Sequence, residues 1–509
     1  MNPAMPLEPA SPAAVLEVGE RLTEAPSRSL TDIAFSGELR TQLGLASGIG
    51  WVDLAHTLTL AEQGVIRPDA ARSLIAALLA LREDDSGFAP SAAYGDLYTN
   101  REAWLAERTQ TVGWLGVARA RREALTTAYH LMLCDELLGL GEALAGAVER
   151  LSTLSLRHRS TLMPDYTYLQ RAQPTTFGHY LQSFAWPALR DLDRIEALYG
   201  RADQCPAGIG SSNGSVISQN RYKLAERLGF SQPVRHARDA MWQADIPLEA
   251  CTVALASVLN LDRLAEDLMI FASAEFGFIK LADRHARASK IMPQKRNPFA
   301  LAFIRATANR LIGVQAGVAA TARTPSGQID NRLFAYDAVP DAVRSAAQVA
   351  SLTAECVEKL AVDEARTRAA LDDRSACASD LAERLMVASG IDYRAAQRVV
   401  ARLVRALDDR GLCLAGTNAS DVINSLKSAG LPADRVTEEL VAAALDPTVC
   451  VSVRKDVGCA APEEVAAMAS ELNDMVSGRR RNFESARARR EAALSRLLAE
   501  AKAFAGGVP

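Results

Sequence analysis

The sequence lacks the patterns by which proteins commonly hold metal ions. Its eight cysteines are scattered, and none of them stands in a C-x-x-C pair. Its six histidines show no ligand spacing such as H-E-x-x-H. We therefore expect no zinc site, no other metal and no cofactor, and the cysteine usage indicates a reduced, cytoplasmic protein.

Further absences narrow the class of protein. No apolar stretch approaches the roughly 20 residues that a membrane span needs, so no membrane partner is expected. Residues 1–29 lack the basic start and apolar run of a signal peptide. The formal net charge of −4 is small for 509 residues and gives no indication of a nucleic-acid partner. Aromatic residues make up only 6%, while alanine, leucine and arginine dominate, which favours helices.

What the sequence has instead is apolar residues at helical spacing. Long segments carry them at i, i+3 and i+4 with few helix breakers, and these segments are residues 115–162, 176–204, 247–276, 298–324 and 331–371. At 1.5 Å per residue the first would form a rod of about 70 Å. We predict an all-α protein built on long helices that bury their apolar sides against one another.

Three domains are predicted from where prolines and glycines gather. Residues 115–371 form a central domain of long helices, and residues 1–114 and 372–509, with shorter helices and more turns, form a small domain at either end. Residues 253–268 are apolar over much more than one face. Such a helix is either buried within one subunit or lies in a bundle between subunits, and we favour the bundle.

The strongest chemical signal precedes the fourth long run. It reads Ser289-Lys-Ile-Met-Pro-Gln-Lys-Arg-Asn-Pro298. A helix start with Asn297 as the N-cap and Pro298 at the first helical position would explain Asn-Pro, but not Ser289 or Lys295. The segment resembles the signature G-S-x-x-M-P-x-K-x-N-P of the fumarase/aspartase superfamily, with Ala288 in place of the glycine.

The resemblance extends along nearly the whole chain and is closest to argininosuccinate lyase. Residues 166–174, YTYLQRAQP, resemble that family's Y-T-H-L-Q-R-A-Q-P, and residues 264–268 with 274–278 resemble L-A-E-D-L and Q-E-F-G-F. The glycine-rich segment 208–214 and the segment 380–383 are also similar to the family. The resemblance implies a fumarase/aspartase-type bundle of long helices, in which the central helices of four subunits assemble a homotetramer. It also implies composite active sites to which three different subunits contribute.

The resemblance also implies a reaction, in which an amine is eliminated from an N-succinyl compound and fumarate is released. Removing a proton beside a carboxylate creates negative charge that fixed donors must hold. By resemblance, Ser289 is the general base, and Lys295 with Asn297 stabilises the intermediate. A serine is a weak base, so it needs nearby cations and loop closure. The loop of residues 283–296 supplies such cations.

Substrate contacts are implied in three further segments. Arg119 and Arg121 match two arginines of the family's substrate segment, and an arginine suits a dicarboxylate because its guanidinium binds a carboxylate with two hydrogen bonds. Thr167 and Gln170 occupy positions that contact substrate or orient its neighbours. Gln328 lies where a third substrate segment is barely recognisable.

The sequence departs from argininosuccinate lyase within the expected site. Tyr168 replaces a histidine, and Ala302 replaces the glutamate that pairs with it, so both halves of the pair are absent. Tyr98 and Arg122 replace a further histidine and an asparagine. Among the histidines present, only His285, on the signature loop, is expected near the chemistry.

These departures leave three functions open. The first is a lyase for another small N-succinyl dicarboxylate, of a kind that suits specialised metabolism, with an acidic or easily expelled leaving group; Tyr168 and Arg122 then act on that group. The second is a genuine argininosuccinate lyase in which Tyr168 does the work of the histidine. The third is a catalytically silent scaffold, which is disfavoured because it has no reason to keep Ser289, Lys295 and Asn297 together.

Overall fold

The computed structural model describes residues 11–84, 87–328 and 330–506. Its helices are α1 (Pro12–Val15), α2 (Ser36–Gln42), α3 (Ala46–Glu62), α4 (Pro68–Glu83), α5 (Leu97–Ala106), α6 (Arg121–Arg157), α7 (Phe177–Ala202), α8 (Arg221–Arg227), α9 (Ala237–Trp242), α10 (Asp245–Phe271), α11 (Phe299–Thr321), α12 (Asp330–Leu333), α13 (Ala335–Glu358), α14 (Glu364–Ala369), α15 (Ala378–Ser389), α16 (Tyr393–Asp408), α17 (Ala419–Ser428), α18 (Glu438–Ala444), α19 (Pro447–Ser452) and α20 (Pro462–Gly506).

Short two-stranded ribbons connect the helices. They pair β1 (Leu162–Thr167) with β2 (Gln170–Thr176), β3 (Gln204–Cys205) with β4 (Gln232–Pro233), β5 (Ile279–Lys280) with β8 (Ala361–Val362), and β6 (Arg287–Ala288) with β7 (Arg296–Asn297). The β3–β4 pair is parallel and the others are antiparallel. The predicted all-α long-helix fold is confirmed.

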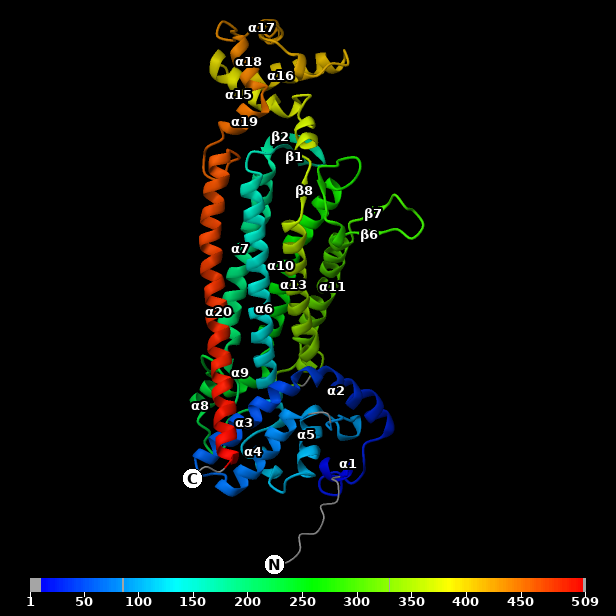
Figure 1. The fold of residues 1–509 in the computed structure, drawn as a ribbon, viewed down its shortest axis with the longest axis vertical. Helices are drawn as coiled ribbons and strands as arrows, with labels where there is room; N and C mark the ends of the chain where they lie inside the picture. The colour runs from blue at the N-terminus through cyan, green and yellow to red at the C-terminus, as the bar shows by residue number, and fades with distance from the viewer. Residues whose placement is uncertain (1–10, 85–86, 329, 507–509) are drawn as a thin grey trace, which may run out of the picture.

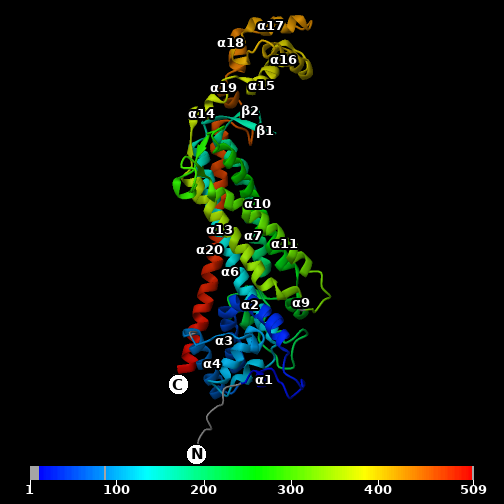
Figure 2. The same ribbon diagram turned by 90° about the vertical axis from the view of Figure 1, so that its right-hand side faces the viewer.

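The long helices run side by side along the long axis of the molecule (Figures 1 and 2). α6 packs against α7, α13 and α20, while α10 packs against α7, α11 and α13. The N-terminal elements α1–α5, with α8 and α9, gather at one end of this bundle, and α15–α19 form a smaller body at the other end. The bundle thus separates two ends that carry different candidate site residues. Among the described helices, none is long and apolar enough to cross a membrane.

α6 forms the centre of the bundle because it is apolar on several sides. Its buried residues recur at helical spacing from Leu125 to Leu154. Gly141 lets α20 approach closely, since a Cβ at this position would lie 2.7 Å from the ring of Phe483. A larger residue here would push α20 away from the bundle.

The predicted long segments all contain a long helix, but the helices are shorter than predicted. α6 begins at Arg121 rather than at residue 115, because residues 112–116 form a 3-10 turn and Ala118 has a φ of 54°. Its 37 residues correspond to about 55 Å at 1.5 Å per residue. The fifth segment leaves its helix at Glu358 and continues through β8 and α14. The N-cap of α11 is Pro298, whereas Asn297 lies in β7.

The expectation that residues after 372 form only shorter helices is wrong for α20. This helix spans 45 residues and returns along the bundle to contact α4 and α8 at the N-terminal end. Its arginines pair with carboxylates on α6 and α7, in the pairs Arg480–Glu149, Arg487–Glu142, Arg490–Asp135 and Arg479–Asp193. The helix also buries apolar residues at spacings of three and four, among them Val465, Ala469, Leu472 and Val476, as an amphipathic helix does. How the chain divides into domains stays a prediction.

One face of the bundle remains apolar and open in the single chain. α11 exposes Phe299, Phe303 and Ile312, and α10 exposes Leu259 within the segment 253–268. The inner faces of the same helices are buried in the main core. The apolar breadth noticed in residues 253–268 therefore has two parts, one that packs within the chain and one that faces outward.

Candidate active site

The signature segment forms a hairpin that projects from the side of the bundle (Figure 1). β6 and β7 pair Arg287 with Asn297 and Ala288 with Arg296, so Ser289 and Lys295 begin and end the connecting loop. The Ser289 amide donates to the carbonyl of Lys295 at 3.3 Å. The hairpin thus places these two signature residues side by side at the base of an exposed loop.

The Ser289 hydroxyl faces backbone donors of its own loop. Its Oγ accepts hydrogen bonds from the amides of Met292, at 3.1 Å, and Ile291, at 3.4 Å. Donors aimed at an oxygen stabilise negative charge on it, which is what a serine needs to act as a base. The Asn297 amide group donates to the carbonyl of Arg287 at 3.0 Å, which ties the two strands together.

The cations of this loop divide into paired and unpaired groups. Arg296 pairs with Asp283 at 2.7 Å, and Arg287 lies 5.1 Å from the ring centroid of Phe299. Within the described part of the chain, the ammonium groups of Lys290 and Lys295 have neither a hydrogen bond nor an ion pair, and both side chains are exposed. Lys295 is therefore available to an anionic ligand.

His285 lies behind this hairpin rather than on it. Its ring is buried, and its Nε2 lies 3.7 Å from the carboxylate of Glu355 on α13. In the described residues neither ring nitrogen has a hydrogen-bond partner. The structure thus places His285 against the bundle and not beside Ser289 on the exposed loop.

The second group of candidate residues occupies the tip of the β1–β2 hairpin. Thr167 and Gln170 close a two-residue turn formed by Tyr168 and Leu169. Both turn residues have positive φ, 55° and 57°, as a type I′ turn requires. Glycine and asparagine suit such a turn, so two larger residues here carry strain. Tyr168 is fully exposed in the single chain. Its side chain is therefore available to a ligand or to another subunit.

The third group lies at the opposite end of the bundle, where α6 begins. Arg119 is completely buried and shares Asp53 with Arg101, at 2.8 Å and 2.9 Å. Its Nη2 also donates to the Tyr98 hydroxyl at 3.2 Å. Burial alone would lower the pKa of Arg119, but its interactions with Tyr98 and Asp53 raise that pKa above its ordinary value. Arg119 was predicted to contact substrate, yet in the single chain its guanidinium is enclosed by protein.

Arg121 and Arg122 are more accessible than Arg119. Arg121 is largely exposed and pairs with Asp96 at 2.9 Å, and the other oxygen of Asp96 caps the start of α5. Arg122 lies 5.3 Å from the ring centroid of Trp242, within the range of a cation–π contact. Among the described residues, no carboxylate lies within ion-pair distance of Arg122. Arg122 is therefore the one of the three arginines that forms no ion pair in the described chain, although its charge acts on the nearby carboxyl group of Glu38.

Two carboxyl groups lie next to these arginines, Glu102 partly buried and Glu123 fully buried. Burial raises the pKa of Glu102 to about 7, although Arg119 opposes that shift. Burial likewise raises the pKa of Glu123 to about 7, and its carboxylate accepts the amides of Gly208, at 2.8 Å, and Ile209, at 3.1 Å. Burial also raises the pKa of Tyr98 to about 12, so its hydroxyl stays protonated. This end of the molecule is thus a dense network of charged and polar groups.

The glycine-rich segment is held within this network. The backbones of Arg119 and Gly210 form an isolated parallel β-bridge, and Gly210 has a φ of 65°. A Cβ at Gly210 would lie 2.8 Å from the carbonyl oxygen of Gly214. Only glycine fits at this position. The backbone geometry therefore explains why this segment, which resembles the family's glycine-rich segment, has a glycine here.

Gln328 lies at the same end as the arginines. Its side chain is exposed, and its amide donates to the carbonyl of Pro325 at 3.2 Å. The preceding turn is fixed by Arg238, which donates to the Ser326 hydroxyl at 2.9 Å. The segment then enters α12, where Asn331 donates to the carbonyl of Trp242 at 3.1 Å.

The three groups do not meet within one chain. α6 alone separates Arg121 from the β1–β2 hairpin by about 55 Å, and Figure 1 shows the signature hairpin on a third part of the bundle surface. The chain brings Arg119, Arg121 and Arg122 together with Tyr98, and it separately groups Ser289 with Lys295 and Asn297. Ala302 lies on the exposed face of α11, next to the signature hairpin.

Sequence comparison assigns the chain to a family. A family model described as lyase matches residues 57–313. An argininosuccinate lyase of Methanoculleus marisnigri is 32% identical over 462 residues, covering 89% of this chain and 92% of the relative. One of Methanothrix thermoacetophila is 30% identical and covers 88% and 91%. The chain belongs to this lyase family.

Solved structures of similar fold agree with the bundle of this lyase. A crystal structure of EDDS lyase in complex with formate matches with a TM-score of 0.85 and 24% identity, covering 95% of this chain and 97% of the other. A class II fumarase from Schistosoma mansoni matches with a TM-score of 0.65 and 14% identity, covering 80% and 90%. The predicted resemblance to argininosuccinate lyase within the fumarase/aspartase superfamily is confirmed, and the protein is a fumarate-releasing carbon–nitrogen lyase.

Proposed function

We propose that this lyase eliminates a nitrogen leaving group from an N-succinyl compound other than argininosuccinate. The observation that supports this most directly is Arg122, which lies against Trp242 and forms no ion pair with the described residues. A guanidinium placed there favours an acidic group on the leaving amine and disfavours the cationic guanidinium of argininosuccinate. Tyr168 and Ala302 replace a histidine–glutamate pair of argininosuccinate lyase, and this replacement also favours a different substrate.

In the proposed reaction the signature hairpin performs the chemistry. Ser289 takes a proton from the carbon beside a carboxylate, and the electron pair left on that carbon spreads into the carboxylate. Lys295 and Asn297 stabilise this extra negative charge. The carbon–nitrogen bond then breaks, the carbon–carbon double bond of fumarate forms, and the leaving nitrogen takes up a proton. A neutral Tyr168 can donate a hydrogen bond to that nitrogen but cannot supply positive charge.

The other two groups of residues supply the substrate contacts. Arg121 is largely exposed beside Asp96 and can bind a substrate carboxylate. Thr167 and Gln170 are both exposed beside Tyr168, where they can hold a second carboxylate. Arg122 and Gln328 would then face the leaving group. Arg119, being buried, would act by keeping Tyr98 and Asp53 in place.

We further propose a homotetramer in which three subunits complete each site. The separation of about 55 Å along α6 keeps Arg121 away from Thr167 of the same chain. The apolar face that carries Phe299, Phe303 and Ile312 needs a partner, because large exposed apolar patches mark interaction surfaces. Light scattering should give a mass near four times 54.6 kDa, and a stable monomer would contradict the assembly. The cytoplasmic location and a role in specialised metabolism stay predictions.

Absorbance from released fumarate tests the function. Purified protein is mixed with a panel of N-substituted aspartates whose nitrogen carries acidic, electron-poor, neutral or guanidinium-bearing groups. We expect the highest kcat/KM with an acidic or electron-poor leaving group and little or no turnover of argininosuccinate. Arg122→Asn should lower the preference for acidic groups by about tenfold, the scale of one ion pair in a partly shielded site. Arg323→Asn, which changes an exposed arginine outside the three groups, serves as the matched control.

A genuine argininosuccinate lyase is the second candidate, and the similarity to relatives of that name over about nine tenths of the chain favours it. Efficient cleavage of argininosuccinate in the panel would establish this activity and overturn the specificity proposed above. Absence of fumarate from every compound would instead support a silent scaffold.

A further inference from the structure

The β1–β2 hairpin is fastened to the C-terminal cap, which we define as residues 372–461. Arg171 on β2 pairs with Asp373 at 2.8 Å, and Gln173 donates to the Ser379 hydroxyl at 3.1 Å. Arg454 of the cap donates to the carbonyl of Pro174 at 2.6 Å. Three contacts thus join one strand of the hairpin to a body that is remote in sequence.

The cap side of this joint is itself preorganised. One oxygen of Asp373 accepts hydrogen bonds from the amide and the hydroxyl of Ser375, at 2.9 and 2.7 Å, and the other oxygen accepts from Arg171. Arg454 is held by both oxygens of Asp380, at 2.9 and 2.8 Å. The donors and acceptors of the cap that bond to the hairpin are therefore held in place by other residues of the cap. A shift of the cap would move β2 with it.

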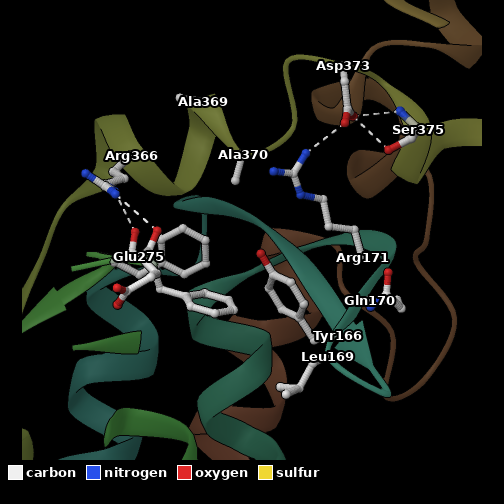
Figure 3. A pocket seen from close by; sticks show the side chains of 12 residues that line it. Tyr166, Leu169, Gln170, Arg171, Glu275, Arg366, Ala369, Ala370, Asp373 and Ser375 are labelled. Atoms are coloured by element: carbon white, nitrogen blue, oxygen red, sulfur yellow. Dashed lines mark hydrogen bonds and ion pairs between the residues drawn. The ribbon is translucent and has the colours of Figure 1, made fainter. Parts of the chain in front are cut away.

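An open pocket lies beside the joint, as Figure 3 shows. It has a volume of about 660 Å³, and its lining includes Tyr166, Gln170, Arg171, Arg366 and Asp373. Arg366 donates to carbonyls of the turn that follows α10, including those of Ala274 and Glu275. Across this gap, only Arg171 and Asp373 of the residues drawn in Figure 3 bond the hairpin to the cap. The Arg171–Asp373 pair thus links β2 to the cap beside the pocket, while β1 is supported by the bundle.

The strained tip makes the joint necessary. Tyr168 and Leu169 hold positive φ without the glycine that would make this turn easy. Strain of this kind persists only where the surrounding structure fixes the flanking residues. On the β1 side, the ring of Tyr166 packs against Phe276 and Phe278, with centroids 5.4 and 6.2 Å apart. On the β2 side, the contacts with the cap do the same work.

We propose that Arg171 and Asp373 are positioning residues, which hold the hairpin so that Thr167, Tyr168 and Gln170 meet the substrate. This inference rests on the function proposed above, in which those three side chains face substrate. The pair is half exposed, with 41% of the Arg171 and 37% of the Asp373 side chain accessible. Exposed ion pairs of this kind contribute little to stability, so their effect on the hairpin can be measured without unfolding the protein.

The first test is kinetic. Arg171→Gln and Asp373→Asn should each lower kcat by about tenfold or more, because small misplacements of groups at a reacting centre are costly. KM should stay within about threefold and the melting temperature close to that of the wild type. Arg171→Lys keeps the positive charge and a hydrogen-bond donor, so it should retain most of the wild-type kcat. Glu83→Gln, which removes the half-exposed pair with Lys502 at the opposite end of the molecule, is the matched control.

The second test does not need a substrate. Hydrogen exchange followed by mass spectrometry should show faster exchange over residues 162–176 in Arg171→Gln and Asp373→Asn, and no change in Glu83→Gln. Unchanged exchange overturns the proposal whatever happens to kcat, since Arg171 would then act directly or not at all. Faster exchange with unchanged kcat overturns it as well. If the wild type releases no fumarate from any compound, the proposed function fails. Hydrogen exchange then decides the role of the pair alone: faster exchange in the variants supports it, and unchanged exchange contradicts it.

Discussion

The arginine end of the molecule and the signature hairpin are built in opposite ways. Arg119, which precedes α6, is fixed by Asp53 on α3 and Tyr98 on α5, and its side chain is completely enclosed. Ser289 and Lys295 belong to a hairpin that is held chiefly by its own backbone and exposes most of its side chains. A site for a dicarboxylate benefits from a rigid half that binds and a mobile half that closes over the substrate and excludes water. We therefore propose that the arginine end is a rigid half in which binding is preorganised, and that the signature hairpin is a mobile half whose closure completes the chemistry.

The largest expected effect comes from breaking the rigid half. Asp53→Asn removes the counter-ion that Arg101 and Arg119 share, and leaves two buried guanidinium groups without a full negative charge. Breaking a buried pair in this way costs about 3–5 kcal/mol of unfolding free energy. Urea unfolding measures the loss. A change below about 1 kcal/mol would show that this end is less rigid than its contacts indicate.

Substitutions in the mobile half should affect turnover rather than stability. Ser289→Ala should lower kcat by about 10²-fold or more, the usual scale for a general base, while KM changes little. Lys295→Ala should be as severe, because the developing charge loses its nearest cation. Stopped assays of fumarate release measure both variants, and urea unfolding should be unchanged.

Lys290→Ala provides the control for these two substitutions. Lys290 lies on the same loop, is exposed, and like Lys295 makes no ion pair with the described residues. It should retain most of the wild-type kcat. Near wild-type turnover by Ser289→Ala would show that the assigned base is wrong.

A smaller effect should appear in the pH dependence of the rigid half. Burial raises the pKa of Glu102 to about 7, above its value of 4.5 in the unfolded chain. An acid with a raised pKa stabilises the fold fully below pH 4.5, and this contribution is lost as pH rises towards 7. Glu102→Gln should therefore remove about 3 kcal/mol of the decrease in unfolding free energy over that window, since one pKa unit corresponds to about 1.4 kcal/mol. Identical pH profiles for both proteins would contradict the shift.

The sequence predicts the mobile half better than the rigid half. Ser289, Lys295 and Asn297 lie within nine residues of each other, so a local motif is enough to find them. Asp53 and Arg119 are 66 positions apart, and no spacing pattern joins them before the chain folds. Asp96 was detectable in principle, because it precedes α5 as an N-cap. Its second role, the pair with Arg121, depends on tertiary structure.

The same limit applies to the fold. Helical periodicity found the long helices that pack through apolar stripes, such as α6 and α10. It missed α20, although this helix buries Val465, Ala469, Leu472 and Val476 at spacings of three and four and adds ion pairs between its arginines and carboxylates of the bundle. The substitutions at Tyr168, Ala302 and Arg122 were visible in the sequence, but the contact of Arg122 with Trp242 joins residues that lie 120 positions apart. Patterns reveal local chemistry and burial, whereas ion-pair partners become visible only in three dimensions.

The smallest effect is expected from the acidic residue of the mobile half, Asp283, which is the counterpart of Asp53. It pairs with Arg296 at 2.7 Å, but 94% of its side chain is accessible. An exposed pair gains little from Coulomb attraction, because water screens the charges and the side chains lose freedom on pairing. Asp283→Asn should change the unfolding free energy by about 0.5 kcal/mol or less, against about 3–5 kcal/mol for Asp53→Asn. Urea unfolding of the two variants side by side checks the ratio. Equal losses would mean that the hairpin is as firmly held as the arginine end, and closure of a mobile half could not then complete the site.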